Sequence, residues 1–449
     1  MRNCTNGFSG ATPEPQAERR ASIRRPTVLD VFSGVGGLSL GFEQAGFDIA
    51  AAVEIDPVHA ATHEFNFPHC RMHCADATEI SGAAIAQELS APIDVIIGGA
   101  PCQGFSMIGK RALDDPRNQL IKHFLRLVIE LEPSVFVLEN VRGLTVGKHR
   151  QLLDELTVEF EAAGYSVALP WQVLNARHFG VPQDRQRLFL LGAKGAAAPG
   201  YPITEIMAPM PTCHDALHDL PDAEQFDELI SSDSVYVGKP PATLSAYAKE
   251  MRCLSGDAWH HSYQREWNPH LMTASLRTAH TEISRRRFRD TRSAAVEPIS
   301  RFYKLAAGGV SNTLRAGTDS ARGAFTSPRP IHYRYDRCVT VREMARLHGF
   351  PDWFRFHITK WHGGRQIGNS VPPPLARAVA GSVREALGAE PVPPKRSIPL
   401  GHPKLLQMDM TEAAAYWRVD VPIAKRDRKS GATKRKQQDI ERELTRASA

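Results

Sequence analysis

The sequence predicts an α/β protein, in which a mostly parallel sheet carries helices on both faces and a smaller irregular domain follows it. Two observations support this prediction. Short apolar runs alternate with segments of helical periodicity from Thr27 to about residue 194, which is the pattern of a parallel sheet with crossover helices. After Gly195 the alternation stops, and no period is recognisable until Thr340. A length of 449 residues allows about two or three domains.

The alternating region divides into individual elements. We expect strands over 27–32, 49–54, 93–98, 134–139, 165–174 and 187–193, and helices over 38–45, 57–65, 119–131 and 149–162. Thr340 and Glu343 form a capping-box pattern that opens a helix ending at Gly349. A last helix is predicted over 375–387.

These elements define the expected domain boundaries. Residues 1–26 are polar and are expected to be disordered. Residues 27–194 form the first part of the main domain, 195–325 the irregular domain, 326–390 a return segment that completes the main domain, and 391–449 a basic extension.

Composition and charge exclude several classes of protein. Hydrophobic residues make up 42% and charged residues 23%, no apolar run reaches the roughly 18 residues of a membrane span, and the N-terminus lacks the apolar core of a secretory leader. Seven cysteines at irregular spacings do not form a disulfide scaffold, so we expect a cytoplasmic protein. Of the net charge of +6, the last 25 residues carry +5 and the first 26 carry +3, which leaves the body at −2.

A glycine-rich loop follows the first predicted strand. In Asp30-Val-Phe-Ser-Gly-Val-Gly-Gly37 the glycines let a ligand approach the backbone, and a helix N-terminus offers free N–H groups. Ser39 occupies the position at which the dinucleotide fingerprint closes with a small residue, so the loop does not match that fingerprint. Glu54 and Asp76 follow at the ends of later strands, where they could bind ribose hydroxyls. An ordinary glycine turn explains the loop alone, but the combination fits S-adenosylmethionine best.

Three further polar groups stand at predicted strand ends. Cys102 lies in a Gly- and Pro-rich turn after the predicted strand 93–98. A lone cysteine is usually a buried apolar residue, but the carboxyl ends of parallel strands are where ligand crevices form. Glu139 ends the next strand, and Arg185 and Arg187 alternate at the entry to another. Solvated strand ends are the alternative for each group taken singly.

Taken together, these motifs resemble those of the DNA cytosine-C5 methyltransferases, from about Thr27 to Leu387. The resemblance is carried by FSGVGG, Glu54, Asp76, PCQGFS, the DPRN segment at 115–118, ENV at 139–141, QDRQR at 183–187, TVREMARLHGFP at 340–351 and QIGNSVP at 366–372. Ala100 and His348 depart from residues that are usual in the family. The implied fold is the Rossmann-like sheet of S-adenosylmethionine-dependent methyltransferases with a target-recognition domain.

The resemblance also implies residue roles. The implied catalytic residues are Cys102 as the nucleophile toward cytosine C6, Glu139 as the donor to N3, and Arg185 and Arg187 as residues that hold the base oxygen and order the glutamate. The implied cofactor residues are Phe32, Gly34, Val35, Gly36, Gly37, Glu54, Ile55, Asp76, Pro101, Asn369, Ser370 and Val371. No residue is an evident base for removing the C5 proton, and water could serve.

The expected activity is methyl transfer from S-adenosylmethionine to C5 of a flipped cytosine in a short duplex DNA site, in a restriction-modification or orphan setting. Methylation of tRNA and an inactive DNA-binding regulator are the alternatives. PCQGFS and the sizeable irregular domain favour DNA over tRNA, and the presence of the presumed reacting residues disfavours the regulator. We expect a monomer whose partners are double-stranded DNA and, functionally, a cognate endonuclease.

Three other features received weaker interpretations. The stretch from Arg277 to Arg292 contains six basic and two acidic residues and could contact phosphates or guanine edges, or be a solvated surface. The stretch from His69 to Cys74 has metal-like composition but cramped spacing, so we expect no metal. The basic tail could be a localisation signal or a DNA contact, and we favour DNA contact.

Overall fold

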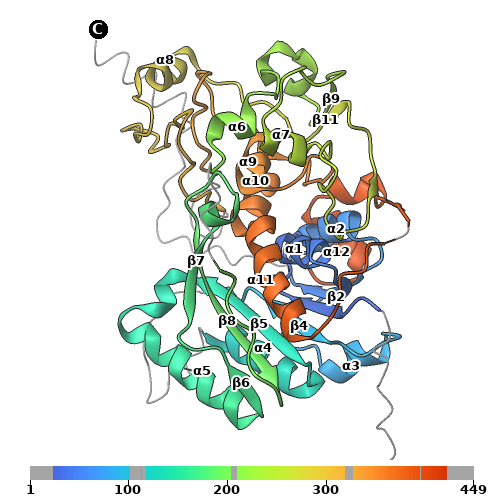
Figure 1. The fold of residues 1–449 in the computed structure, drawn as a ribbon. Coiled ribbons are helices and arrows are strands. Elements are labelled where there is room, and N and C mark those ends of the chain that lie inside the picture. Colours follow the sequence, from blue (N-terminus) through green and yellow to red (C-terminus); the bar gives the residue numbers. More distant parts are fainter. Residues whose placement is uncertain are drawn as a thin grey trace, which may run out of the picture.

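A central sheet positions the residues of interest. The computed structural model describes residues 24–101, 113, 118–203, 210–318, 327–394 and 396–421. The strand order is β3-β2-β1-β4-β5-β8-β6, with β7 paired to β8 (Figure 1). The strands are β1 (Thr27–Val31), β2 (Asp48–Glu54), β3 (Arg71–Cys74), β4 (Val95–Gly98), β5 (Val135–Val141), β6 (Tyr165–Val167), β7 (Gln172–Asn175) and β8 (Gln186–Lys194). Strands β1 to β5 pair in parallel, whereas β8 runs antiparallel to β5, β6 and β7.

Alternating residues of each strand enter two different apolar cores. Val28 of β1 faces one core and Leu29 the other, because successive side chains of a strand point to opposite faces. One core includes residues of α1 (Gly37–Gln44) and α11 (Pro373–Ala386). The second includes residues of α3 (Gly82–Gln87), α4 (Gln119–Leu131) and α5 (Arg150–Ala162). The predicted α/β fold class is confirmed.

Most predicted elements are present within two residues at either end, and the differences concern β3, β6, β7, α3 and α10. No bounds were predicted for the strand β3. The predicted strand 165–174 was wrong: it is two strands, β6 and β7, separated by residues that include Pro170, which has no N–H for a ladder. The helix α10 (Lys360–Asn369) was missed, because its glycines disguise its periodicity. Helix α3 was also missed, since it spans only six residues.

The irregular domain contains short elements linked by long turns. They are α6 (Cys213–Leu217), β9 (Val235–Tyr236), α7 (Ala246–Met251), β10 (Arg265–Glu266), β11 (Leu271–Met272) and α8 (Glu282–Asp290). Two-residue strands and helices of five to nine residues give no sustained period, which explains why the sequence pattern disappears here. Figure 1 shows this domain above the sheet.

Buried ion pairs attach this domain to the rest of the chain. The guanidinium of Arg265, on β10, donates to both carboxylate oxygens of Glu43 on α1, each at 2.9 Å. The guanidinium of Arg346 is bound to both Asp219 and Asp352. Arg346 lies on α9 (Val341–His348), whose predicted Thr340–Glu343 capping box and left-handed Gly349 cap are confirmed. The arginines of helix α9, Arg342 and Arg346, are therefore buried and are not part of the surface.

Part of the chain beyond α11 also forms helices and a short strand. Residues 396–421 contain β12 (Ile398–Pro399), which pairs with β10, the short 3₁₀ helix η9 (Pro403–Leu406) and α12 (Met410–Trp417). Helix α12 and η9 pack against α2 (Pro57–Asn66). No helix in the described ranges is long and apolar enough to cross a membrane.

Helices α1 and α11 come into direct backbone contact at Gly41. A Cβ atom at Gly41 would lie 2.3 Å from Cβ of Ala376 and 2.6 Å from the backbone nitrogen of Arg377. Glycine is needed here because neither neighbouring atom belongs to a flexible side-chain end.

We therefore expect Gly41→Ala to lower the free energy of unfolding by about 1–3 kcal/mol through overpacking. The matched control is Gly381→Ala on α11, where a Cβ would meet nothing within 4 Å. That change should raise the free energy of unfolding by about 0.5–1 kcal/mol, because alanine is the better helix former. Urea denaturation measures both, and equal effects would contradict the proposed close approach.

Candidate active site

The candidate site lies at the carboxyl ends of β1, β4 and β5. Strand β1 has β2 on one side and β4 on the other, so the chain order reverses there, and a crevice is expected at such a point. The glycine loop follows β1, the turn at 99–101 follows β4, and Glu139 lies near the end of β5.

Glu139 is held by Arg187 across the sheet. The two residues lie on neighbouring antiparallel strands, and Nε of Arg187 is 2.8 Å from Oε1 of Glu139. Only 11% of the Glu139 side chain and 15% of the Arg187 side chain are exposed. Burial raises the pKa of Glu139, and the charges of Arg187 and Arg185 oppose this rise. A glutamic acid in this setting can hold its proton at higher pH than an exposed one.

The turn that leads toward Cys102 is packed against Glu139 and its neighbour. A Cβ atom on Gly99 would lie 2.8 Å from Oε2 of Glu139. The side-chain amide of Asn140 donates to the carbonyl oxygen of Ala100 at 3.1 Å. Pro101 is exposed. Cys102 lies outside the described residues, as do the rest of the PCQGFS motif after Pro101 and most of the DPRN segment.

Arg185 has partners different from those that the resemblance implied. Its guanidinium, 0% exposed, donates to the carbonyl oxygens of Leu314 at 2.9 Å, and of Gly368 and Ser370 at 2.8 Å each. Arg187, and not Arg185, contacts Glu139. The two arginines therefore have different contacts. Arg187 orients Glu139, and Arg185 joins backbone segments that are distant in the sequence.

The glycine loop is fixed by Glu54. One carboxylate oxygen of Glu54 accepts the N–H of Gly34 and the other accepts that of Asp56, both at 2.8 Å. Phe32, Gly34 and Gly36 have positive φ angles of 63°, 56° and 94°, which explains the glycines at the last two positions. Val35 is buried, and Gly36 caps the start of α1. Glu54 therefore shapes the loop directly, while its remaining lone pairs are free to accept further bonds.

The space next to this loop suits a small organic cofactor. The hydroxyl of Ser33 is buried and has no hydrogen-bond partner among the described residues. A Cβ on Gly34 would meet nothing within 4 Å, and Ile55 exposes 55% of its surface beside Glu54. Asp76 follows β3 and accepts the N–H of Thr78 at 2.8 Å. Open backbone, an exposed apolar side chain and carboxylates fit a nucleoside with a charged amino-acid part.

The late motif Asn369-Ser370-Val371 closes the other side of the loop. A Cβ on Gly37 would lie 2.4 Å from the carbonyl oxygen of Val371, so the two backbones touch. His348, a departure from the family pattern, contacts two neighbours. Its Nε2 atom is 3.1 Å from the carbonyl oxygen of Ser370, and its Nδ1 atom is 2.9 Å from Nε2 of Gln183. Burial lowers the pKa of His348 well below its usual value, so a neutral imidazole fills this position.

The basic stretch of the irregular domain is largely neutralised. On α8 and nearby, carboxylates of Glu224, Asp290, Glu297 and Asp336 lie within 4 Å of Arg285, Arg286, Arg287 and Arg289, respectively. Only Arg286 and Arg289 keep more than half of their side chains exposed. Most of this stretch is therefore a surface of ion-paired, partly exposed arginines and not a free cationic surface.

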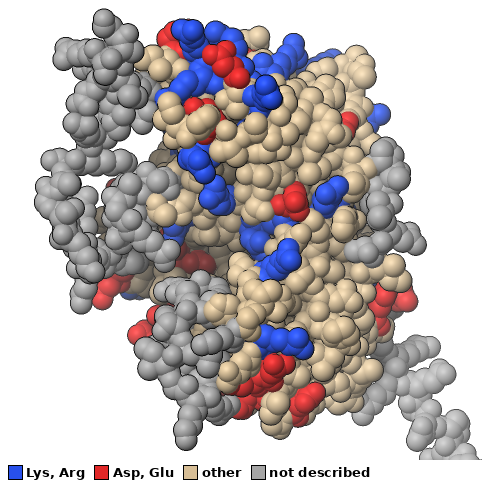
Figure 2. Space-filling model, turned by 90° about the vertical axis from the view of Figure 1, so that its left-hand side faces the viewer, with Lys and Arg blue, Asp and Glu red and all other residues tan. Residues whose placement is uncertain are grey.

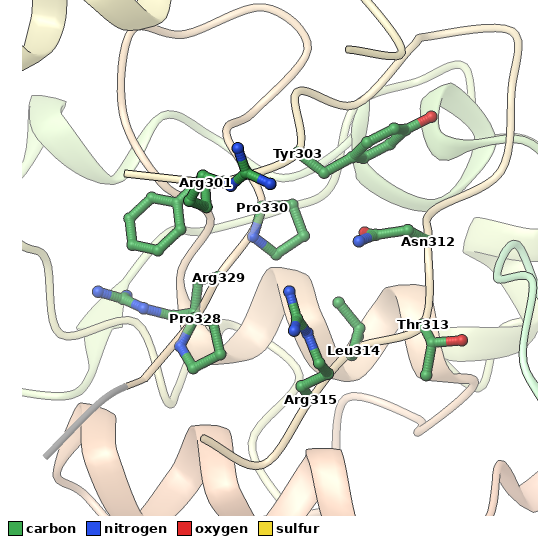
Figure 3. A pocket seen from close by; sticks show the side chains of 10 residues that line it. Arg301, Tyr303, Asn312, Thr313, Leu314, Arg315, Pro328, Arg329 and Pro330 are labelled. Carbon is green, nitrogen blue, oxygen red and sulfur yellow. The ribbon is translucent and has the colours of Figure 1, made fainter. Parts of the chain in front are cut away.

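A different pocket offers two unpaired arginines. Arg315 and Asn312 extend into it, and Arg301 lies across from Arg315 (Figure 3). Both arginines are exposed, and among the described residues neither guanidinium has an ion-pair partner. Arg301 has a positive φ of 62°, a conformation that is uncommon outside glycine. Figure 2 shows Lys and Arg side chains spread from the upper to the lower part of the face viewed there.

Arg301 and Arg315 were not among the residues predicted from the sequence. Isolated arginines in an irregular region carry no periodic signal, whereas the arginines of α8 are clustered in the sequence. One wall of the pocket depends on contacts between segments far apart in the sequence. Residues 311–314 form backbone and side-chain hydrogen bonds with residues 182–185, including one from the N–H of Asp184 to the carbonyl of Ser311 at 2.8 Å.

No group of three or more His, Cys, Asp or Glu in the described part of the chain is arranged to hold a metal ion. The site therefore consists of a glycine-loop cradle, a buried Glu–Arg pair and a strand-end turn on a mostly parallel sheet. This combination defines a methyltransferase-type α/β fold.

Comparison with known proteins gives the family. The family model described as "C-5 cytosine-specific DNA methylase" matches residues 26–385. The chain is 54% identical over 413 residues to the type II methyltransferase M.XorII of Xanthomonas oryzae pv. oryzae, covering 90% of this chain and 96% of that protein. It is 35% identical over 364 residues to M1.HphI of Haemophilus parahaemolyticus, covering 80% and 86%.

A solved structure agrees. A protein described as a DNA modification methyltransferase encoded within an E. coli prophage has a TM-score of 0.64 at 32% identity, with 81% of this chain and 99% of that chain covered. The chain belongs to the C-5 cytosine-specific DNA methylase family and is a DNA cytosine-5 methyltransferase.

The contact at Gly99 leads to a prediction. We expect Gly99→Ala to lower the rate of methyl transfer by about 10- to 100-fold, because a Cβ there must displace the carboxyl group of Glu139, and small misplacements of reacting groups are costly. The control is Gly200→Ala, where a Cβ would meet nothing within 4 Å. Single-turnover assays with labelled cofactor compare the two. A Gly99→Ala rate equal to that of the parent would contradict the assigned contact.

Proposed function

We propose that this enzyme methylates C5 of a flipped cytosine within a short duplex DNA sequence, through a covalent bond from Cys102 to C6, as part of a restriction-modification system or as an orphan enzyme. The supporting observation is the packing of the 99–101 turn, which leads directly into Cys102, against Glu139 and Asn140. The resemblance to type II methyltransferases supports the biological setting.

The proposed cofactor is S-adenosylmethionine, which supplies a methyl group on a sulfonium when bound. Glu54 and Asp76 would bind hydroxyl or amino groups of the nucleoside, and Ile55 would cover one face of the adenine. The loop Phe32 to Gly37 and the segment Asn369 to Val371 would hold the amino-acid part, with Pro101 nearby. The unpartnered Ser33 hydroxyl and the open Gly34 support this assignment.

The residues of the chain would activate the base in a defined order. The Cys102 thiolate adds to C6, and electron density moves to C5 while Glu139 donates a proton or a hydrogen bond at N3. Arg187 keeps the Glu139 carboxyl oriented through the 2.8 Å contact. After C5 has gained the methyl group, it loses its proton to a base or to water, and the S–C6 bond breaks to return the thiolate. Arg185 acts as a positioning residue.

The target base must leave the duplex to reach these groups. The pocket with Arg301 and Arg315 is proposed to bind the DNA around the target, because exposed, unpaired guanidinium groups suit phosphates and guanine edges. Residues 311–314, which form one wall of this pocket, are hydrogen-bonded to residues 182–185. That segment ends two residues before Arg187. DNA held in this pocket would therefore lie at a fixed position relative to Glu139.

The experiment that tests the proposed chemistry replaces the nucleophile. Cys102→Ser should lower methyl transfer by at least about 10³-fold, because removing a nucleophile removes the reaction route. Cys253→Ser, a half-buried cysteine of the second domain, is the control and should leave the rate unchanged. Duplexes carrying 5-fluorocytosine should trap the parent enzyme, with Cys102 as the linked residue in mass spectrometry. Trapping through another residue, or an active Cys102→Ser enzyme, would overturn the assignment.

The arginine pocket gives a separate prediction. Arg301→Ala and Arg315→Ala should each weaken binding to target duplexes by about fivefold or more, since each base or phosphate contact contributes about 1–3 kcal/mol or about one unit of salt slope. Arg286→Ala, on the exposed face of α8, is the control and should change affinity less than twofold. Fluorescence anisotropy at several salt concentrations, with target and unrelated duplexes, distinguishes phosphate from base contacts. Unchanged affinities for both pocket variants would exclude the pocket.

A further inference from the structure

The segment from Ile398 to Trp417, named here the C-terminal brace, folds beyond the residues matched by the family model. It starts on the second domain, where β12 pairs with β10, and it ends beside the first turn of α2 (Figure 1). The brace therefore lies outside the residues matched by the family model and reaches the first turn of α2.

The brace contacts α2 along its length. The indole N–H of Trp417 donates to the carbonyl oxygen of Pro57 at 3.2 Å, at the first residue of α2. At the other end, the N–H of Gly401 donates to the carbonyl of Phe65 at 2.8 Å. Between them, buried apolar side chains of the brace pack on buried ones of α2: Leu405, Leu406, Met408 and Ala413 on Val58, Ala61 and Phe65.

The brace also holds the loop that precedes α10. The N–H of Ile358 donates to the carbonyl of Leu406 at 3.1 Å, and Nε2 of His357 is 3.0 Å from the carbonyl of Met408. A further link joins α10 to α2 directly, because the side-chain amide of Gln366 donates to the hydroxyl of Thr62 at 2.9 Å. The brace therefore fixes α2 and α10 relative to one another.

These two helices carry opposite walls of the candidate cofactor site. Helix α2 begins directly after Glu54, Ile55 and Asp56, and α10 ends at Asn369, directly before Ser370. A small displacement of either helix would change the width of the site without touching Glu139 or the 99–101 turn.

We propose that the C-terminal brace positions the cofactor site, with Trp417 as the positioning residue for Glu54 to Asp56. This inference rests on the proposed cofactor site. Trp417 fixes the carbonyl of Pro57, which lies one residue after Asp56, and Asp56 in turn caps α2 and binds Glu54 through its N–H. Loss of the indole donor loosens the first turn of α2 while the apolar packing of the brace remains.

The test uses the full-length protein and Trp417→Phe, which removes the N–H donor and keeps an aromatic ring. The matched control is Tyr416→Phe, which removes the neighbouring hydroxyl bond to Glu64, a residue in the second half of α2. Calorimetry gives the affinity for S-adenosylhomocysteine, steady-state kinetics give KM for S-adenosylmethionine and kcat, and hydrogen exchange reports on amides 54–62.

For Trp417→Phe we expect Kd and KM for the cofactor to rise about threefold to tenfold, the range expected for loss of one hydrogen bond, with kcat unchanged. Exchange at 54–62 should become faster while the midpoint of urea unfolding stays near that of the parent. Tyr416→Phe should leave Kd, KM and exchange at 54–60 unchanged.

Equal Kd, KM and exchange in Trp417→Phe and the parent would overturn the proposal, as would a fall in kcat alone. If Trp417→Phe is too unstable to purify, Trp417→His, which retains a ring donor, replaces it, and failure to restore the parent Kd then counts against the proposal. If the parent itself binds no S-adenosylhomocysteine, the proposed cofactor site fails, while the exchange data still decide whether Trp417 orders Glu54 to Asp56.

Discussion

One buried guanidinium connects the three parts of the active site. Arg185 lies directly before β8, is 0% exposed, and donates to the carbonyl of Leu314 in the irregular domain and to those of Gly368 and Ser370. Removing a charge from water costs several kcal/mol, so a buried cation is tolerated only where acceptors surround it. Burial accordingly lowers the pKa of Arg185 well below its usual value. The backbone segments that carry these carbonyls are therefore held together around the charge.

The entry of β8 also joins the arginine pocket to Glu139. Arg185 and Arg187 are two residues apart, and Arg187 holds Glu139 at 2.8 Å. The segment 182–185 is bonded to 311–314, which forms one wall of the arginine pocket. A displacement of the pocket wall is therefore transmitted to β8 through short, direct bonds. His348 strengthens this junction, since it bridges Gln183 and the Ser370 carbonyl as a neutral ring. Each ring nitrogen of His348 faces one of these two partners.

The sequence predicted those parts of the fold that depend on periodicity and caps. The helix 119–131 and the Thr340 capping box were placed correctly because apolar spacing and cap chemistry are local. The family resemblance implied that Arg185 and Arg187 order Glu139, and Arg187 contacts Glu139. The roles of Arg185 and the α8 arginines could not be assigned in this way. Whether an arginine meets a carbonyl, a carboxylate or solvent depends on residues elsewhere in the chain, such as Leu314 for Arg185 and Glu224 for Arg285, and one sequence contains no record of those contacts.

Close backbone contact explains why the site needs glycine where the chain segments meet. At Gly37 a Cβ would lie 2.4 Å from the Val371 carbonyl, and at Gly368 it would lie 2.3 Å from the Ala316 nitrogen. These two glycines face rigid backbone, so no side chain can move aside to admit a larger residue. Gly34, by contrast, has open space around its Cβ position and needs glycine only for its φ of 56°. The first two glycines therefore allow close contact of the glycine loop with Val371 and of α10 with Ala316. Gly34 leaves room on the side of the loop where a ligand would bind.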